Sequence, residues 1–235
     1  GYNKIKFLNN NTGFTCGSSQ SSGYKGLNKS TDGGVTWFSL NVPDVYLNYL
    51  DMVVLNEDTI WLVSSESLTG GVFRTTNGGQ SWTQQLSAGS QNPDKIYMYN
   101  ARIGFICDNA SGAINLLKTT NGGDNWFTVV TGQGFYDMKF IDSLTGWRAK
   151  DLIKKTTDGG LTWVEQQFPT GVGGITLFPS IRSISALNKD TLWGGYGAAV
   201  YPNWLARGIL LQTTDGGNVW RYQIPDTSFQ IPRYK

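Results

Sequence analysis

The sequence of 235 residues contains no histidine and only two cysteines, Cys16 and Cys107. Without histidine, the chain cannot form a Ser–His or Cys–His nucleophile pair or a zinc site with a histidine ligand. Two cysteines are too few for a disulfide scaffold or a cysteine-based metal site, so we expect no metal and no cofactor. Each cysteine follows a Gly-Phe-x run, and we expect both thiols to be buried and too far apart to form a disulfide.

Charge and long apolar runs are also scarce. Charged residues make up 15% of the chain and the formal net charge is +2, which gives no electrostatic basis for binding nucleic acid. No apolar run approaches the roughly 20 residues that cross a bilayer, so no membrane insertion is expected. The 30 glycines and 13% aromatic residues are typical of short strands and tight turns in secreted proteins. We therefore expect an extracellular, cell-surface or periplasmic location. Because the chain begins at Gly1, we expect a processed form or a segment of a longer protein.

The dominant feature of the sequence is a fivefold repeat. Five segments, called box segments below, share the pattern Ser/Thr-x-Asp/Asn-Gly-Gly-x-x-Trp, and their tryptophans are 45, 44, 37 and 57 residues apart. A period of this length is what a four-stranded propeller blade occupies. The Asp or Asn and the Trp of the five segments are, in order, Asp32 and Trp37, Asn77 and Trp82, Asn121 and Trp126, Asp158 and Trp163, and Asp215 and Trp220.

Two short β-rich runs precede each box segment, separated by polar turn residues such as those at 9–11 or 142–143. One unit is therefore expected to hold four strands, and the chain is predicted to be an all-β β-propeller of four-stranded antiparallel blades. We expect one domain over residues 1–235. The approximate blades are 1–42, 43–88, 89–131, 132–168 and 169–224, with a tail at 225–235 that closes the ring or begins a further blade of a larger one.

The box segments have a clear structural interpretation. Paired glycines between two β runs predict a hairpin turn in which both adopt positive φ. The Asp or Asn side chain is expected to accept hydrogen bonds from turn amides, together with the Ser or Thr two residues earlier. The closing Trp is expected to pack in the seam between sheets. Asn replaces Asp in two of the five segments, which argues against a calcium site at each box.

These residues resemble the Asp-box, or BNR-type, repeat of sialidases, sortilin-type receptors and xyloglucan-cleaving glycosidases. The double-glycine form, with Gly-Phe or Gly-Trp in a preceding strand, looks most like the photosystem II stability and assembly factor-type repeats that also occur in bacterial surface proteins. The resemblance covers nearly the whole chain and implies a β-propeller. It implies no single function, because this repeat occurs in scaffolds, receptors and enzymes alike.

Length variation points to the end of the blades opposite the box segments. The connections 41–50, 168–180 and 194–208 differ in length from their counterparts in other blades, and variable loops on a rigid scaffold are the usual place for binding. Trp204 is the one tryptophan outside the repeat framework, and we expect it either to form part of a binding platform or to pack its own loop. The candidate binding residues are Tyr24, Tyr136, Tyr196, Tyr201, Trp204 and Arg207.

The sequence favours a non-enzymatic module of a secreted or cell-surface protein that contacts a protein or a glycan through the variable loops. The alternative is a glycosidase-like, carbohydrate-active enzyme, which would need two carboxylates and no histidine. No catalytic residue is assigned, since nothing in the sequence pairs the acids. The carboxylates in or near the variable loops are Asp44, Asp51, Glu66, Asp94, Asp108 and Asp137.

Overall fold

The computed structural model describes residues 2–18, 26–64, 66, 69–87, 92–108, 114–168, 181–200 and 205–223, without the side chains at 196–200, 205–209 and 222–223. The chain divides into two units, Gly1–Gly134 and Phe135–Lys235, and each is described by itself. Across the described residues there is no helix, and hence none long and apolar enough to span a membrane.

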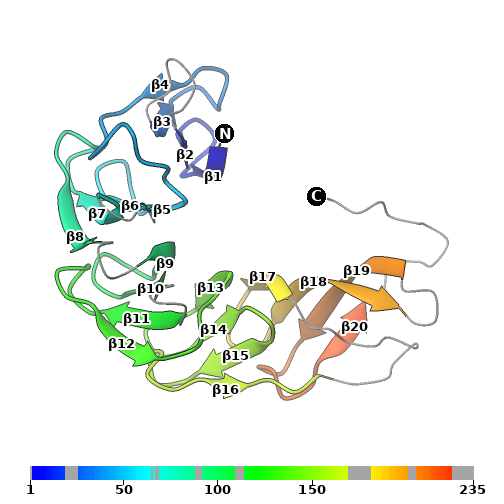
Figure 1. Cartoon of the computed structure of the whole chain (residues 1–235). Helices are drawn as coiled ribbons and strands as arrows, with labels where there is room; N and C mark the ends of the chain where they lie inside the picture. The colour runs from blue at the N-terminus through cyan, green and yellow to red at the C-terminus, as the bar shows by residue number, and fades with distance from the viewer. Residues whose placement is uncertain are drawn as a thin grey trace. The chain divides into compact units, whose positions relative to one another are not determined.

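The secondary structure consists of five four-stranded antiparallel sheets, in each of which the strands follow chain order (Figure 1). This confirms the predicted all-β propeller fold with four-stranded blades. Blades 1 to 3 belong to the first unit and blades 4 and 5 to the second. The strands are β1 (Tyr2–Phe7), β2 (Gly13–Gly17), β3 (Leu27–Ser30) and β4 (Phe38–Ser39) in blade 1; β5 (Asp51–Val54), β6 (Ile60–Ser64), β7 (Gly71–Thr75) and β8 (Thr83–Ser87) in blade 2; β9 (Pro93–Met98), β10 (Gly104–Asp108), β11 (Asn115–Thr119) and β12 (Phe127–Val130) in blade 3; β13 (Asp137–Phe140), β14 (Gly146–Ala149), β15 (Ile153–Thr156) and β16 (Val164–Glu165) in blade 4; and β17 (Ile181–Ala186), β18 (Leu192–Val200), β19 (Leu205–Thr213) and β20 (Arg221–Gln223) in blade 5.

The box segments form the turns between the third and fourth strands, and the same hydrogen bonds recur in each. In blade 1, the Ser30 hydroxyl donates to Asp32 Oδ1 (2.8 Å) and accepts from the Gly34 amide (2.8 Å). Asp32 Oδ1 also accepts from the Thr36 amide (2.9 Å). Both box glycines have positive φ in all five segments, so the predicted turn chemistry is confirmed. The equivalent Ser/Thr-to-Asp/Asn bonds are Thr75 to Asn77, Thr119 to Asn121, Thr156 to Asp158 and Thr213 to Asp215.

The turns between the first and second strands are closed by a second repeated device. In blade 1, Asn9 Oδ1 accepts hydrogen bonds from the amides of Asn11 (2.9 Å) and Thr12 (2.8 Å). Such Asx turns satisfy two backbone donors that a tight turn would otherwise leave unpaired. The residues that play the same part in blades 2 to 5 are Asn56, Asn100, Asp142 and Asn188.

A backbone hydrogen bond joins the two kinds of turn within every blade. In blade 1 the amide of Gly33, the first box glycine, donates to the Asn11 carbonyl at 2.9 Å. Both turns therefore lie at the same end of the blade, called the box end below, and the remaining connections lie at the other end, the loop end. The matching pairs are Gly78 to Asp58, Gly122 to Arg102, Gly159 to Leu144 and Gly216 to Asp190.

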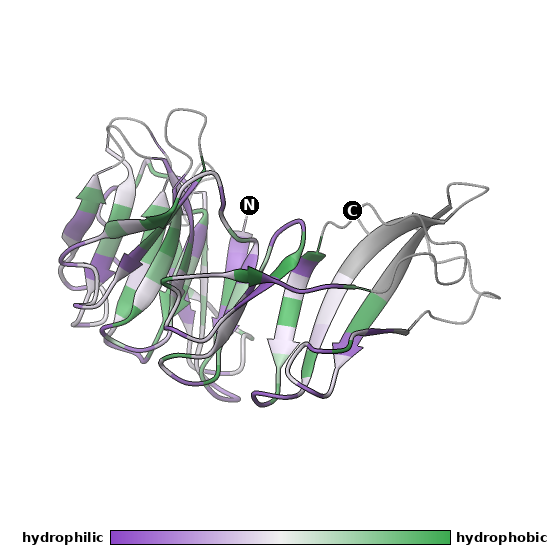
Figure 2. Ribbon diagram, turned by 90° about the horizontal axis from the view of Figure 1, so that it is seen from below, coloured by the Kyte–Doolittle hydropathy of each residue, from purple (hydrophilic) through white to green (hydrophobic). Residues whose placement is uncertain are grey.

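Apolar and polar residues alternate along several strands (Figure 2), and buried apolar side chains join blades 1 and 2, blades 2 and 3, and blades 4 and 5. Phe14 of blade 1 packs in one cluster with Met52 of blade 2, and Trp61 of blade 2 packs with Ile96 of blade 3. In the second unit, Trp147 of blade 4 packs with blade 5. Trp61 and Trp147, in the second strand of their blades, are fully buried.

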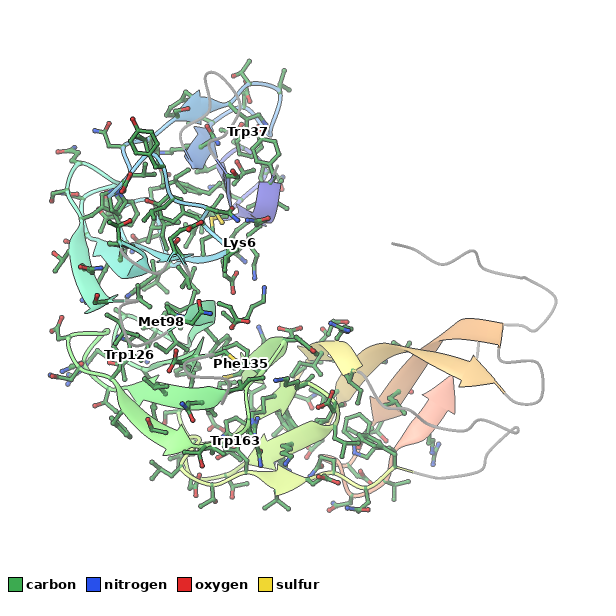
Figure 3. The ribbon with its side chains drawn as sticks, viewed as in Figure 1. Lys6, Trp37, Met98, Trp126, Phe135 and Trp163 are labelled. Atoms are coloured by element: carbon green, nitrogen blue, oxygen red, sulfur yellow. The ribbon has the colours of Figure 1, made fainter. Side chains whose placement is uncertain are left out.

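The box tryptophans are less buried than the sequence suggests. Trp220 is buried, but the other four are half-buried, because each lies beside its turn with part of the indole open to solvent. Three of them are labelled in Figure 3, each within its own blade: Trp37, Trp126 and Trp163. Trp82 and Trp126 pack against the seams between blades 1 and 2 and blades 2 and 3, and Trp220 lies in the seam between blades 4 and 5, so the predicted seam position is confirmed for these three.

Cys16 and Cys107 are buried and free, as expected. They occupy matching places on β2 and β10 of the first unit. Burial, with a smaller contribution from the nearby Asp51 carboxylate, raises the pKa of the Cys16 thiol to about 12. A thiol with this pKa stays protonated at neutral pH and is a poor nucleophile.

The box aspartates should make the free energy of unfolding depend on pH in the acidic range. Hydrogen bonds from the Thr36 hydroxyl and amide lower the pKa of Asp32 to about 2, and the pKa values of Asp158 and Asp215 are lowered by equivalent bonds. A depressed folded-state pKa stabilises fully above the unfolded pKa near 4, and that stabilisation is lost as pH falls through the folded value. Replacing all three by Asn, the residue already present in blades 2 and 3, should reduce the loss of stability between pH 5 and pH 2.5. Urea unfolding at the two pH values measures this, and equal losses in both proteins would contradict it.

Thiol reactivity provides a second check on the fold. At pH 8 the native protein should react slowly with a disulfide reagent, because both thiols are buried and the pKa of Cys16 is about 12. In concentrated guanidinium chloride two thiols per chain should react at once. A count of zero in denaturant would mean that the two cysteines form a disulfide.

Candidate functional site

The predicted binding residues fall into two groups. Tyr24, Tyr201 and Trp204 lie outside the described residues, and the side chains of Tyr196 and Arg207 are not described either. Tyr136 is described and partly exposed, with 36% of its surface open to solvent.

The expected long loop over 194–208 is wrong. Strands β18 and β19 continue through most of it and pair from Leu192 with Thr213 to Val200 with Leu205. Glycines and β-compatible apolar residues fill this stretch, so antiparallel pairing can satisfy its backbone groups. Only residues 201–204 lie between the two strands.

Tyr136 lies at the loop end of blade 4, immediately before β13. Its amide donates to the Ala149 carbonyl at 2.7 Å, which ties it to the end of β14. Lys150 follows β14 directly, and its Nζ lies 5.8 Å from the centre of the Tyr136 ring. The Arg182 guanidinium carbon lies 4.3 Å from the same centre. Two cations from two blades therefore contact one aromatic ring.

The backbone of blade 5 explains how Arg182 reaches Tyr136. The pairing of β17 with β18 shifts register between Ile181 and Ser183, so Arg182 occupies a β-bulge, a feature that redirects a side chain. The Asp137 carboxylate fixes the two strands side by side, because it accepts from the amides of Met138 and Ile184, each at 2.9 Å. The cluster is thus held by the backbone of both blades.

The cluster of Tyr136, Lys150 and Arg182 has the composition of an anion site. Cation–ring contacts of this kind stabilise the cations by about 0.5–1 kcal/mol at exposed positions and leave their N–H donors available. Neither Arg182 nor Lys150 forms an ion pair with another described residue. An arginine beside a lysine matches the geometry and charge of a carboxylate.

Sequence reasoning identified Tyr136 but missed Arg182 and Lys150. The repeat contains a signal for Arg182, because Tyr136 and Arg182 both stand two residues before a matching buried residue of their inner strand, Met138 or Ile184. Equivalent positions in successive blades lie side by side. Nothing in the sequence marks Lys150, whose importance depends on where β14 ends.

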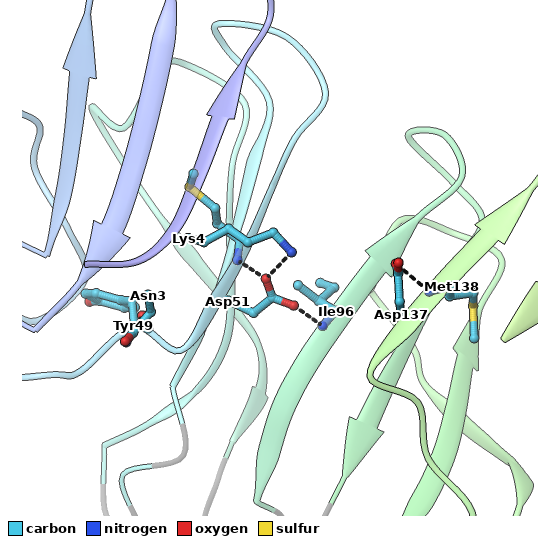
Figure 4. A network of polar contacts seen from close by, with 8 residues as sticks. Asn3, Lys4, Tyr49, Asp51, Ile96, Asp137 and Met138 are labelled. Carbon is cyan, nitrogen blue, oxygen red and sulfur yellow. Dashed lines mark hydrogen bonds and ion pairs between the residues drawn. The ribbon is translucent and has the colours of Figure 1, made fainter. Parts of the chain in front are cut away.

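Three of the six candidate carboxylates hold the fold together. Asp51 is buried and accepts from the amides of Met52 (3.0 Å) and Ile96 (3.2 Å), and it forms an ion pair with Lys4 at 2.9 Å (Figure 4). Asp137 makes the equivalent link from blade 4 to blade 5. Asp108, also buried, accepts from the Asn92 amide at 2.6 Å.

The other three acids have different surroundings. Asp44 accepts from the Tyr46 amide within its loop, at 2.8 Å. Glu66 is exposed and Asp94 is half-buried. In the described part of the chain, no three Cys, Asp or Glu side chains are grouped so that they could hold a metal ion.

Comparison with known proteins gives structural matches only. No family model matches the chain, and no curated protein matches it. Among solved structures, the chain is similar to YCF48 bound to D1 peptide, with a TM-score of 0.55 and 16% identity over 94% of this chain and 80% of that one. It is also similar to an ancestral GH74 enzyme, with a TM-score of 0.69 and 18% identity over 94% of this chain. A third similar structure is the GH74 xyloglucanase from Xanthomonas campestris, with a TM-score of 0.66 and 14% identity over 96% of this chain.

These similarities concern the fold. The chain spans only 31% and 38% of the length of the two GH74 enzymes. At such low identities the comparisons support the propeller architecture and assign no activity.

The structural role of Asp51 can be tested by substitution. Asp51→Asn removes the charge that pairs with Lys4 and places an N–H donor against one of two amide donors, so it should lower the free energy of unfolding by about 2–4 kcal/mol. Lys4→Met, which removes the 45%-exposed partner, should cost less than about 1 kcal/mol. Urea unfolding of both variants measures the difference, and equal costs would contradict a clamping role for the carboxylate.

Proposed function

We propose that this chain is a non-enzymatic β-propeller module that binds a partner protein presenting carboxylate groups, at the loop end of blades 4 and 5. The observation that carries the proposal is the cluster in which Arg182 and Lys150 lie over the partly exposed Tyr136 ring. The ring supplies apolar contact and the two cations supply charge-assisted donors, a combination common in protein hot spots.

Three further points support this proposal. The cluster lies at the loop end, where variable connections usually carry binding residues. The backbone amides of Tyr136 and Lys150 are hydrogen-bonded, and ordered backbone lowers the entropy cost of binding. A structure of the same fold, YCF48, has been solved with a bound peptide. We expect the module to act outside the cell, at its surface or in the periplasm, in line with its composition.

The competing hypothesis is a carbohydrate-active enzyme with two carboxylates at the loop end, and two similar structures are GH74 enzymes. Such an enzyme needs two carboxylates placed on either side of a glycosidic bond. Asp51, Asp108 and Asp137 already accept backbone hydrogen bonds. We therefore propose that these three acids stabilise the fold and do not act as catalytic groups.

A peptide array tests the proposed function. The whole chain should bind peptides rich in Asp and Glu or ending in a free carboxylate, more weakly as salt rises. Arg182→Gln and Lys150→Gln should each weaken the best peptide at least tenfold, about 1.4 kcal/mol. Lys189→Gln is the matched control, because Lys189 is exposed in the turn at the opposite end of blade 5 and should bind as the native chain does.

Two outcomes would contradict the proposal. One is binding that has no preference for acidic peptides, and the other is full binding by Arg182→Gln. A polygalacturonate sample tests a carboxylate-bearing glycan as the partner, and product analysis on neutral polysaccharides tests the enzyme hypothesis. Release of cleaved sugars by the native chain would favour the enzyme.

A further inference from the structure

The first unit contains a groove that is separate in location and chemistry from the Tyr136 cluster. It has a volume of about 460 Å³ and lies between the segment that follows β4 and the hairpin of β7 and β8. This volume is within the range of small-molecule sites, roughly 300–1,000 Å³. The residues that line it include Asn41, Pro43, Phe73, Gln80, Trp82 and Gln84.

The environment of Trp82 differs from that of other box tryptophans. Trp37 and Trp163 donate Nε1–H to the carbonyl of their own second box glycine. Each packs edge-to-face, at 6.0 Å, against a phenylalanine of its own inner strand, Phe7 or Phe140. The equivalent residue in blade 2 is Val54, which has no ring.

Trp82 is instead held by the preceding blade. Its Nε1–H donates to the Asn41 carbonyl at 3.1 Å, and both residues line the groove. The indole is half-buried and packs against the seam between blades 1 and 2. It therefore forms one fixed wall of an open groove, with Phe73 buried at its base.

The polar residues of the groove are all uncharged. Asn41, Gln80 and Gln84 are exposed, and Gln84 is oriented by a hydrogen bond from its Nε2 to the Gly70 carbonyl at 3.0 Å. Side-chain amides both donate and accept hydrogen bonds, as sugar hydroxyls do. An indole beside them offers an apolar surface for the C–H face of a pyranose ring. None of the described residues that line the groove is charged, so they offer no counter-ion to a charged ligand.

We propose that this groove binds a neutral sugar of one or two pyranose rings, with Trp82 against the ring face and Asn41 and Gln80 on the hydroxyls. The site is independent of the proposed function, because it lies in the other unit and has no cation. A proline-rich peptide is the other ligand that a tryptophan groove could hold. The amide-rich, uncharged lining favours the sugar.

Nuclear magnetic resonance of the ¹⁵N-labelled whole chain tests this proposal. Trp82→Phe identifies the Trp82 indole signal by its loss. Cellotetraose and maltotetraose are then titrated separately to 20 mM, and at least one should shift the Trp82 indole and the Gln80 and Gln84 side-chain amides. Gln80→Ala should raise the dissociation constant at least threefold and Trp82→Phe at least tenfold. Neither change should disturb the amide spectrum of blades 4 and 5, which belong to the other unit.

Matched variants serve as controls. Leu161→Ala changes the residue that corresponds to Gln80 in the box segment of blade 4, and Trp163→Phe changes the corresponding tryptophan. Both should bind the sugar as the native chain does. The proposal is overturned if neither sugar shifts Trp82, if Trp82→Phe and Gln80→Ala bind as tightly as the native chain, or if an octaproline peptide shifts Trp82 and the sugars do not.

Discussion

The backbone hydrogen bond between the two turns of each blade is the constraint on which the structure depends. The first box glycine donates to a carbonyl of the turn between the first two strands, and this bond recurs in every blade. Only a glycine can hold positive φ there at little cost. The neighbouring Ser/Thr and Asp/Asn side chains satisfy the remaining turn amides. One end of every blade is thus built to a single pattern, and the opposite end is free to vary.

Contacts between blades are mainly apolar, unlike the hydrogen-bonded turns. Apolar residues of one blade pack into the next, and at the edge of two such seams a carboxylate reaches from one inner strand to the amide of the following one. Asp51 does this for Ile96 and Asp137 does it for Ile184. In blade 3 the equivalent residue is Lys95 and in blade 5 it is Ser183. This position of the inner strand therefore carries a negative, a positive or no charge in different blades, although the strand itself recurs in each blade.

The sequence predicts the frame well and the sites poorly. Five glycine pairs with acceptors at fixed spacing identify the turns, and the runs before them identify the strands, because these features are local. The contact of Tyr136 with Arg182 depends on a β-bulge and on two blades lying side by side, and no local pattern encodes either. At Trp82, blade 2 has Val54 at the position where blades 1 and 4 have Phe7 and Phe140, and the repeat pattern alone does not show that Trp82 then bonds to the preceding blade. The stretch 194–208, for which the sequence predicts a loop, is largely part of strands β18 and β19, whose pairing depends on partners on opposite sides of residues 201–204.

The direction of these contacts bears on how the chain is made. The bonds that join the two turns lie inside one blade, between residues that are 15 to 26 positions apart, whereas the carboxylate clamps reach forward to the next blade along the chain. During synthesis, each blade can complete its own turns from residues that are already made. Blades 2 and 4 then present a carboxylate acceptor to the inner strand of the blade that is synthesised next, so for blades 3 and 5 the order of synthesis matches the order in which the contacts can form.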